Sequence, residues 1–249
     1  MAMNPKLLRP RQTSKYAALR SGLLAYWPLN ETATSGDVTA EDWTKRGNNL
    51  TSNNSVLSVS GKVGNARTFV RTNSEYLAGT HADLNLGEVA WTIALWFFVP
   101  TAASNSRFNI FAKDVSGSRQ ILLSYNFTAA GANTADSLFF QHYFATTGSS
   151  TADVTGVSRN TWHFVEMVHA ANASTITCRL NRANERTLTR TSGTWNSFNS
   201  QFNIGRREFS GFNDYADCYV DEFAVWNRAL SAAELDKIYS SGAGIDLRQ

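Results

Sequence analysis

The chain has 249 residues, of which 43% are hydrophobic, and its seven Trp and fifteen Phe are enough for a sizeable core. Only 17% of the residues are charged and the formal net charge is +3, so nothing in the composition demands a nucleic-acid partner. No apolar run approaches the roughly 18 residues that a membrane-spanning helix needs. No secretory signal is visible, because Pro5 and Pro10 interrupt a segment with little apolar character.

Residues 1–21 differ in charge from the rest of the chain, because they carry basic residues while the first acid is Glu31. Two interpretations stay open. The segment is either a solvated, disordered tail or a basic arm that becomes ordered against an acidic partner surface, such as a neighbouring subunit. We therefore expect an arm at residues 1–21 and one domain at residues 22–249. The arm residues that would contact the partner are Lys6, Arg9, Arg11 and Lys15.

Short strands are predicted throughout the domain. The first, Leu23–Leu29, contains Pro28, which places it at a sheet edge or ends it there. Residues Trp91–Val99 are apolar on both alternating faces, which is typical of a central strand covered on both sides. Polar clusters such as Gly148–Ser150 separate the strands. The other predicted strands are Val56–Val59, Val63–Phe69, Glu75–Leu77, Phe108–Lys113, Gln120–Asn126, Leu138–Phe144, Trp162–Ala170, Thr175–Asn181 and Gln201–Gly205.

The stretch Tyr219–Tyr239 predicts a strand followed by a short helix. In the strand, alternation places Val220, Ala224 and Trp226 on one face. The opposite face takes Phe223 and Val225.

The helix that follows has a clear start. Ser231 can cap its first turn, and Glu234 three residues later completes a capping box. Leu235 and Ile238 form an apolar stripe, and Gly242 suits the C-terminal end of the helix.

More than ten short strands and one late helix indicate an all-β protein. We expect an antiparallel two-sheet jelly-roll sandwich with a short C-terminal helix and an extended N-terminal arm. Cys178 and Cys218 both lie in predicted strands. Two buried core cysteines are favoured, and a disulfide is the alternative.

Seven sequence blocks follow one another between residues 22 and 242. They are Gly22–Glu31, Asp42–Leu50, Gly61–Phe69 with Glu75–Leu77, Trp91–Val99, Trp162–Val165, Ile204–Arg206 and Val220–Ser231. In this order they resemble the laminin G-like, pentraxin-like domains of the concanavalin A-like lectin/glucanase jelly-roll superfamily. The chain departs from the family pattern where Asn30 replaces an Asp, Lys45 replaces a loop Gly and Asn181-Arg182 replaces Asn-Gly.

The resemblance implies a calcium ion where the first loop meets the last strand. Calcium takes about six to eight oxygen ligands. The matching positions are Asp42, Asn48 and Asp221, with Asn30 or Glu31 as additional ligands. In the alternative interpretation, Asp42 and Asn48 only shape a turn and Asp221 is a polar strand residue.

The sequence disfavours catalysis. Related jelly-roll glycosidases place their carboxylates as Glu-x-Asp-x-Glu along one strand, and this chain has no such triplet. The four histidines are scattered, and no Gly-x-Ser-x-Gly, phosphate-binding loop or Cys-x-x-Cys occurs. We therefore expect a protein that is not an enzyme.

Glycan binding is the usual activity of the superfamily, and it requires exposed aromatic rings and a few polar groups. Trp195 is the favoured candidate, because Thr194 and Asn196 flank it in a polar loop. For every candidate, a position in the core is favoured over ligand binding. The other candidates are Tyr125, His142, Tyr143 and Phe198.

Several functions stay open. The first is a non-catalytic, lectin-like surface module that binds glycans or a host surface, and the second is a structural protein of a larger assembly. The leader Asn4–Arg11 is similar to short basic leaders of phage-type virion proteins. A phage capsid decoration or tail protein, attached to neighbouring virion subunits through its arm, satisfies both, and a homo-oligomer is a further expected assembly. A secreted or cell-surface carbohydrate-binding or adhesion protein is the alternative, and a glycoside hydrolase relative lacks the expected carboxylates.

Overall fold

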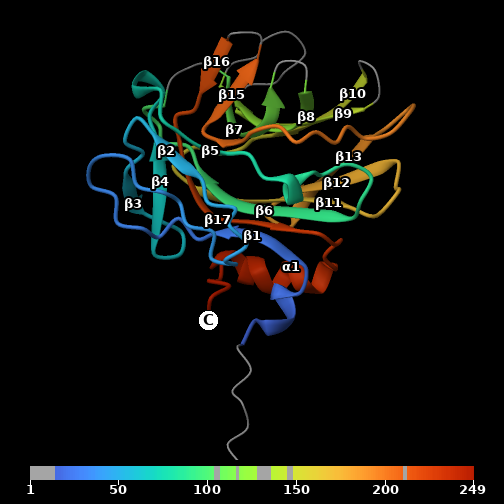
Figure 1. The fold of residues 1–249 in the computed structure, drawn as a ribbon, viewed down its shortest axis with the longest axis horizontal. Helices are drawn as coiled ribbons and strands as arrows, with labels where there is room; N and C mark the ends of the chain where they lie inside the picture. The colour runs from blue at the N-terminus through green and yellow to red at the C-terminus, as the bar shows by residue number, and fades with distance from the viewer. Residues whose placement is uncertain (1–14, 104–106, 116–117, 128–135, 145–147, 210–211) are drawn as a thin grey trace, which may run out of the picture.

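The computed structural model describes residues 15–103, 107–115, 118–127, 136–144, 148–209 and 212–249. Two antiparallel sheets face each other, and a short helix, α1 (Ala232–Tyr239), packs on the outside of one of them (Figure 1). This confirms the predicted all-β sandwich with a short C-terminal helix. Residues 1–14 of the predicted arm, including Lys6, Arg9 and Arg11, lie outside the described residues.

The strands of the eight-stranded sheet are β1 (Leu23–Trp27), β3 (Ser58–Ser60), β4 (Asn65–Phe69), β6 (Trp91–Phe98), β11 (Trp162–His169), β12 (Thr175–Leu180), β13 (Ala183–Thr189) and β17 (Cys218–Trp226). They are ordered β13-β12-β11-β6-β17-β4-β3, and β1 pairs with β17. Short 3₁₀ turns lie at Ala17–Arg20, Arg71–Asn73, Ala82–Leu84 and Ser240–Gly242.

The strands of the seven-stranded sheet are β2 (Thr51–Asn53), β5 (Tyr76–Gly79), β7 (Phe108–Val115), β8 (Ser118–Asn126), β9 (Ser137–Phe144), β10 (Gly148–Thr155) and β14 (Phe202–Ile204). Their order is β10-β9-β8-β7-β14-β5-β2. A separate hairpin, β15 (Arg206–Phe209) with β16 (Phe212–Tyr215), lies against β7 on the outside of this sheet (Figure 1).

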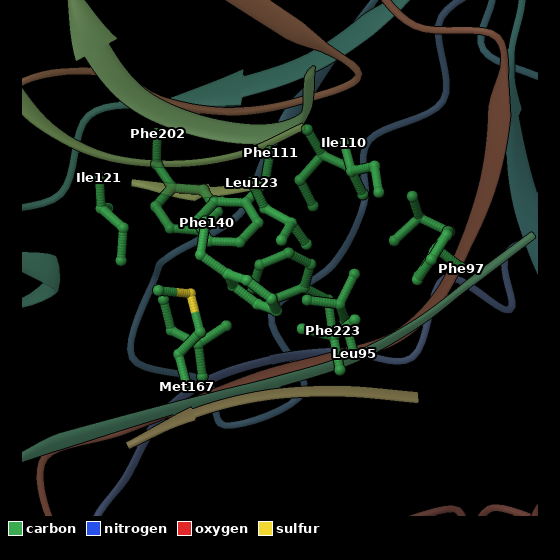
Figure 2. Close-up of a cluster of buried hydrophobic side chains, with 14 of the residues drawn as sticks. Leu95, Phe97, Ile110, Phe111, Ile121, Leu123, Phe140, Met167, Phe202 and Phe223 are labelled. Atoms are coloured by element: carbon green, nitrogen blue, oxygen red, sulfur yellow. The ribbon is translucent and has the colours of Figure 1, made fainter. Parts of the chain in front are cut away.

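The main hydrophobic core fills the space between the two sheets, where apolar side chains from both pack against one another. Figure 2 shows Phe111, Leu123, Phe140 and Phe202 of the seven-stranded sheet approaching Leu95, Met167 and Phe223 of the eight-stranded sheet. Burying one such side chain stabilises the fold by about 1.5–3 kcal/mol.

A second apolar cluster lies on the outer face of the eight-stranded sheet, beneath α1. Leu235 and Ile238 of the helix are buried there, as their spacing predicts. Trp96 of β6 stacks on Tyr239, with 5.7 Å between ring centroids, and lies 5.2 Å from Phe164. Strand β6 is therefore covered on both faces, which confirms the prediction for Trp91–Val99.

The capping box at the start of α1 is also confirmed. Ser231 Oγ accepts the N–H of Glu234, and Glu234 Oε2 accepts the N–H of Ser231 at 2.9 Å. The helix ends earlier than predicted, because Ser240 adopts a left-handed conformation with a φ of 49°. Gly242 instead ends the 3₁₀ turn that follows.

The segment before β1 packs on this outer face. Leu19 is buried at 3% exposure, and the indole N–H of Trp226 donates to the Leu19 carbonyl at 2.7 Å. Arg228 donates to the carbonyl of Ser21. The packed region therefore begins before residue 22, whereas Lys15 is exposed and its ammonium lies 5.0 Å from the ring of Tyr16.

Strand β17 contains a bulge that the sequence pattern did not predict. Its register against β6 shifts between Asp221 and Ala224, and Glu222 has a φ of 51°. An extra residue reverses the alternation of faces. Val220 consequently lies in the core between the sheets, and its predicted place on the same face as Ala224 and Trp226 is wrong.

Some strands went unrecognised in the sequence. Gly148–Ser150, interpreted as a separator, begins β10, which pairs with β9 along its whole length. Small polar residues form this strand because β9 provides its pairing partner, although their own strand propensity is low. The other unrecognised strands are β2, β13, β15 and β16.

The two cysteines are free, and both are completely buried. Burial raises the pKa of each thiol well above its ordinary value. The favoured interpretation, two core residues, is confirmed.

Candidate ligand-binding site

Two of the predicted calcium ligands, Asp42 and Asn48, are engaged in hydrogen bonds with the backbone. Asp42 Oδ1 accepts the backbone N–H groups of Thr44 at 2.9 Å and Tyr26 at 3.2 Å, and its Oδ2 accepts that of Asn48 at 3.2 Å. The amide of Asn48 donates to the Leu24 carbonyl. Asp42 and Asn48 therefore lie together and shape a turn, which is the alternative interpretation.

The third predicted ligand, Asp221, lies in the bulge of β17. Its Oδ2 accepts the N–H of Val63 at 2.8 Å, while its Oδ1 is buried without a partner. Among the described residues, no group of three or more His, Cys, Asp or Glu could hold a metal ion. Calcium binding at Asp42, Asn48 and Asp221 stays a prediction that rests on the resemblance alone.

Burial changes the protonation of the two carboxyls in the bulge. It raises the pKa of Asp221 to about 7. It also raises the pKa of Glu222 well above its ordinary value, and the neighbouring Asp221 charge adds to this. Glu222 Oε2 accepts the hydroxyl of Tyr26. Asp221 is 0% exposed and Glu222 is 6% exposed, so neither carboxyl presents an open face to a substrate.

Trp195 and His142 lie inside the sandwich and not in an exposed loop. Trp195 is 2% exposed, and its indole N–H donates to the Ala173 carbonyl at 3.0 Å. His142 is 0% exposed and its ring centroid lies 4.9 Å from that of Trp195. Burial lowers the pKa of His142 to about 4, so its ring is neutral at pH 7. The core position favoured for each ring is confirmed for these two. Their selection as ligand-binding candidates is wrong, because polar neighbours in sequence do not fix the direction of a side chain.

The two tyrosine candidates lie on opposite faces of the seven-stranded sheet. Tyr125 belongs to the core, where its hydroxyl donates to the Val157 carbonyl at 2.9 Å. Tyr143 instead packs with Phe139 in a small apolar cluster on the outside of the sheet. Of these four rings, Tyr143 is therefore the one on the outward side. The fifth candidate, Phe198, is half-buried, and its carbonyl accepts the Lys113 ammonium.

This outer face of the seven-stranded sheet combines polar side chains with aromatic rings. The strand register places Ser124, Phe139 and Asp153 side by side on β8, β9 and β10, and Gln141 and Tyr143 follow along β9. We call this surface the outer polar face. Its members are Asn109, Gln120, Ser124, Asn126, Phe139, Gln141, Tyr143, Asp153 and Asn203.

Several side chains of the outer polar face keep a buried polar atom without a hydrogen-bond partner. These atoms are Asn109 Nδ2, Gln120 Oε1, Asn126 Oδ1, Asp153 Oδ1 and Asn203 Oδ1. An unpaired buried polar atom costs about 1–3 kcal/mol, and native proteins contain few of them. Asn109, Gln120, Asn126 and Asn203 are at most 1% exposed. The polar side chains of the outer polar face that a ligand can reach are therefore the half-buried Gln141 and Asp153.

Three arginines lie over the same surface. The Arg107 guanidinium lies 4.3 Å from the ring centroid of Phe139, and that of Arg119 lies 4.9 Å from Tyr143. Arg207 Nε donates to the buried carboxylate of Asp114 at 2.7 Å. Burial lowers the pKa of Arg107, and the nearby Arg207 charge lowers it further. The guanidinium groups of Arg107 and Arg119 thus place hydrogen-bond donors beside the rings of Phe139 and Tyr143.

One half of the outer polar face is open to solvent. Along β9 and β10, Gln141 and Asp153 are half-buried, and Ser149 and Thr151 are exposed. The hairpin of β15 and β16 covers the other half, over β7 (Figure 1). A ligand would therefore approach over β9 and β10.

Sequence reasoning missed Phe139 and Gln141, although a signal was present. Alternation along Leu138–Phe144 places residues 139, 141 and 143 on one face. The pattern alone could not show which face points outward, because both faces of this strand carry aromatic residues.

Residues 71–236 match the family model Laminin_G_3, described as the concanavalin A-like lectin/glucanases superfamily, over more than half of the chain. The chain belongs to this superfamily. The match confirms the resemblance drawn from the seven sequence blocks. No curated protein matches the sequence at a significant level.

Solved structures of low sequence identity share the fold. The binding domain of Paraclostridial Mosquitocidal Protein 1 has a TM-score of 0.70 at 13% identity, over 90% of this chain and 53% of that one. The botulinum neurotoxin serotype D ligand-binding domain in complex with N-acetylneuraminic acid has a TM-score of 0.65 at 9% identity, over 90% and 52%. The chain thus spans about half the length of these toxin domains.

A third structure matches over nearly its full length. Domain 4 of AbnA, a GH43 extracellular arabinanase from Geobacillus stearothermophilus, in complex with arabinotriose, has a TM-score of 0.61 at 12% identity. The match covers 86% of this chain and 97% of that one. Within the described residues, none of the helices combines the length and the apolar character that crossing a bilayer requires.

Proposed function

We propose that the chain is a non-catalytic, lectin-like module that binds a glycan on its outer polar face. The observation that carries the proposal is the half-buried amide of Gln141 and carboxyl of Asp153, which lie beside Phe139 and Tyr143 on the solvent-facing strands β9 and β10. Sugar rings stack their C–H faces on aromatic side chains, while their hydroxyls both donate and accept hydrogen bonds. This face offers both kinds of contact.

Membership of the superfamily supports this proposal, as does the arabinotriose complex of the AbnA domain, which has almost the same extent as this chain. The N-acetylneuraminic acid complex gives weaker support, because the chain matches only about half of that toxin domain.

Attachment of the protein to a virion surface through its basic arm remains a prediction from the leader sequence, and a secreted or cell-surface adhesion protein remains the alternative. Most of the arm lies outside the described residues.

Binding to an immobilised glycan array tests the proposal, with variants on the open half of the face. Arg107→Ala removes the guanidinium above Phe139, and Gln141→Ala removes a half-exposed amide. Each should weaken retention of the bound glycan by about tenfold, which corresponds to about 1.4 kcal/mol.

The matched control is Arg46→Ala, which removes an exposed guanidinium from a loop outside the outer polar face. It should bind like the unmodified protein. An array on which no glycan is retained, or equal losses for the variants at 46 and 107, would count against the proposal.

A further inference from the structure

A cavity of about 290 Å³ lies on the rim of the sandwich, between the loop that follows β1 and the C-terminal segment. It shares no residue with the outer polar face. In Figure 1 the C-terminus lies near β1 and α1, which brings the end of the chain to this rim. The side chains around the cavity that matter here are Asn30, Glu31, Glu41, Trp43, Lys45 and Arg248.

Trp43 provides the apolar surface of this cavity, and its position is firmly held. Its backbone N–H donates to the Tyr26 carbonyl at 2.9 Å. The preceding Asp42 is fixed by the amide hydrogen bonds described above. The ring lies edge-to-face with Tyr26 and has Arg20 at 4.7 Å from its centroid. A half-buried indole held in this way loses little conformational entropy when it binds a ligand.

Polar groups of both kinds surround this ring. Glu31 is engaged by Arg67 at 3.3 Å, and Arg248 is engaged by Asp246 at 2.7 Å. Glu41 and Lys45 are exposed, and no described residue engages either side chain. The cavity therefore offers one free acceptor group and one free donor group of opposite charge, with no net charge to select an ion.

Lys45 occupies a backbone conformation that a glycine would adopt more easily. Its φ is 61°, in the left-handed region that is unfavourable for residues with a Cβ atom. Lys45→Gly would therefore remove the ammonium group while favouring the same turn. This gives a variant that tests binding without disturbing the fold.

We infer that this cavity, which we call the Trp43 pocket, is a second ligand site that takes one residue of a neutral sugar. The C–H face of the sugar packs on the indole of Trp43. Its hydroxyls donate to the Glu41 carboxylate and accept from the Lys45 ammonium. The balanced charges favour a neutral polyhydroxylated ring over an anion or a cation, and the volume suits a single sugar unit.

The experiment is an NMR titration of the full chain with a panel of neutral monosaccharides: galactose, glucose, mannose, arabinose and N-acetylglucosamine. The Trp43 indole N–H signal, identified with Trp43→Phe, should shift and saturate with at least one of them. Trp43→Ala should abolish binding of that sugar, and Lys45→Gly should weaken it by about tenfold.

Two controls separate this pocket from the outer polar face. Trp162→Ala removes another half-buried Trp, which contacts Phe98 outside the pocket, and should leave binding unchanged. Arg107→Ala should likewise leave the Trp43 shift intact. The inference is overturned if no monosaccharide shifts the Trp43 signal, if Lys45→Gly binds as the unmodified protein does, or if a charged sugar binds in preference to all neutral ones. If Arg107→Ala alone abolished monosaccharide binding, the sugar would bind at the outer polar face, and the inference of a Trp43 pocket would be overturned.

Discussion

At the scale of single residues, Asp221 should make the stability of the protein depend on pH. Its folded-state pKa is about 7, whereas an unfolded Asp titrates near pH 4. A raised pKa means that folding favours the protonated form, so the contribution is complete below about pH 4 and is lost as the pH rises to about 7. A tenfold change in the acid dissociation constant corresponds to about 1.4 kcal/mol, so the loss amounts to a few kcal/mol.

Asp221→Asn keeps an acceptor for the Val63 N–H but cannot ionise. The free energy of unfolding, measured by denaturant at pH 5 and pH 8, should change less between the two pH values in this variant than in the unmodified protein. The pKa of His142 is lowered to about 4, so this residue makes the free energy of unfolding change with pH in the opposite direction. His142 is present in both proteins, so its contribution cancels when they are compared. Equal pH dependence in both proteins would show that Asp221 is not protonated on folding.

Residue-scale prediction from sequence succeeded where local chemistry decides the outcome. Ser231 and Glu234 form the predicted capping box, since the two groups are only three positions apart. The choice of Trp195 as the favoured ligand-binding ring was wrong, because its burial depends on Phe144 and His142, which are distant in the chain. The unpaired atoms of Asn109 and its neighbours also require the tertiary structure to be recognised.

At the scale of elements, the start of α1 should contribute measurably to stability. Ser231→Ala removes the acceptor for the Glu234 N–H and should cost about 1 kcal/mol. Glu234 itself is held by Arg228 at 2.7 Å, which is the main reason why its pKa is lowered to about 2. Urea denaturation measures the change, and Ser60→Ala on an exposed position of β3 is the control. Equal stabilities of the two variants would contradict a capping role.

Most elements were predictable from apolar alternation, and the exceptions have physical causes. Strand β10 is built from small polar residues, so its assignment depends on pairing with β9 and not on its own sequence. The bulge at Glu222 places Val220 on the opposite face of the sheet from the one that alternation predicts. No single residue in the sequence indicates a bulge of this kind. The prediction of the fold is still correct despite these errors, because the seven sequence blocks specify the central strands.

At the scale of the whole molecule, the two ends of the chain stabilise one another on the outer face of the eight-stranded sheet. Leu19 is buried beside Trp226 and α1, and Arg20 Nε donates to the Leu247 carbonyl at 2.6 Å. A deletion that tests the proposed arm must therefore end before this segment. A larger deletion would destabilise the fold, and the resulting loss of assembly could not be assigned to the arm.

Two truncations make this distinction. Removal of residues 1–21 should lower the free energy of unfolding by about 3 kcal/mol or more relative to removal of residues 1–14. The burial of Leu19 accounts for about 1.5–3 kcal/mol. The Trp226 indole N–H, left without its acceptor, adds about 1–3 kcal/mol. Thermal melting of both proteins measures the difference, and equal midpoints would show that residues 15–21 do not stabilise the sandwich. If they differ as expected, only the shorter deletion can report on an arm that binds a partner.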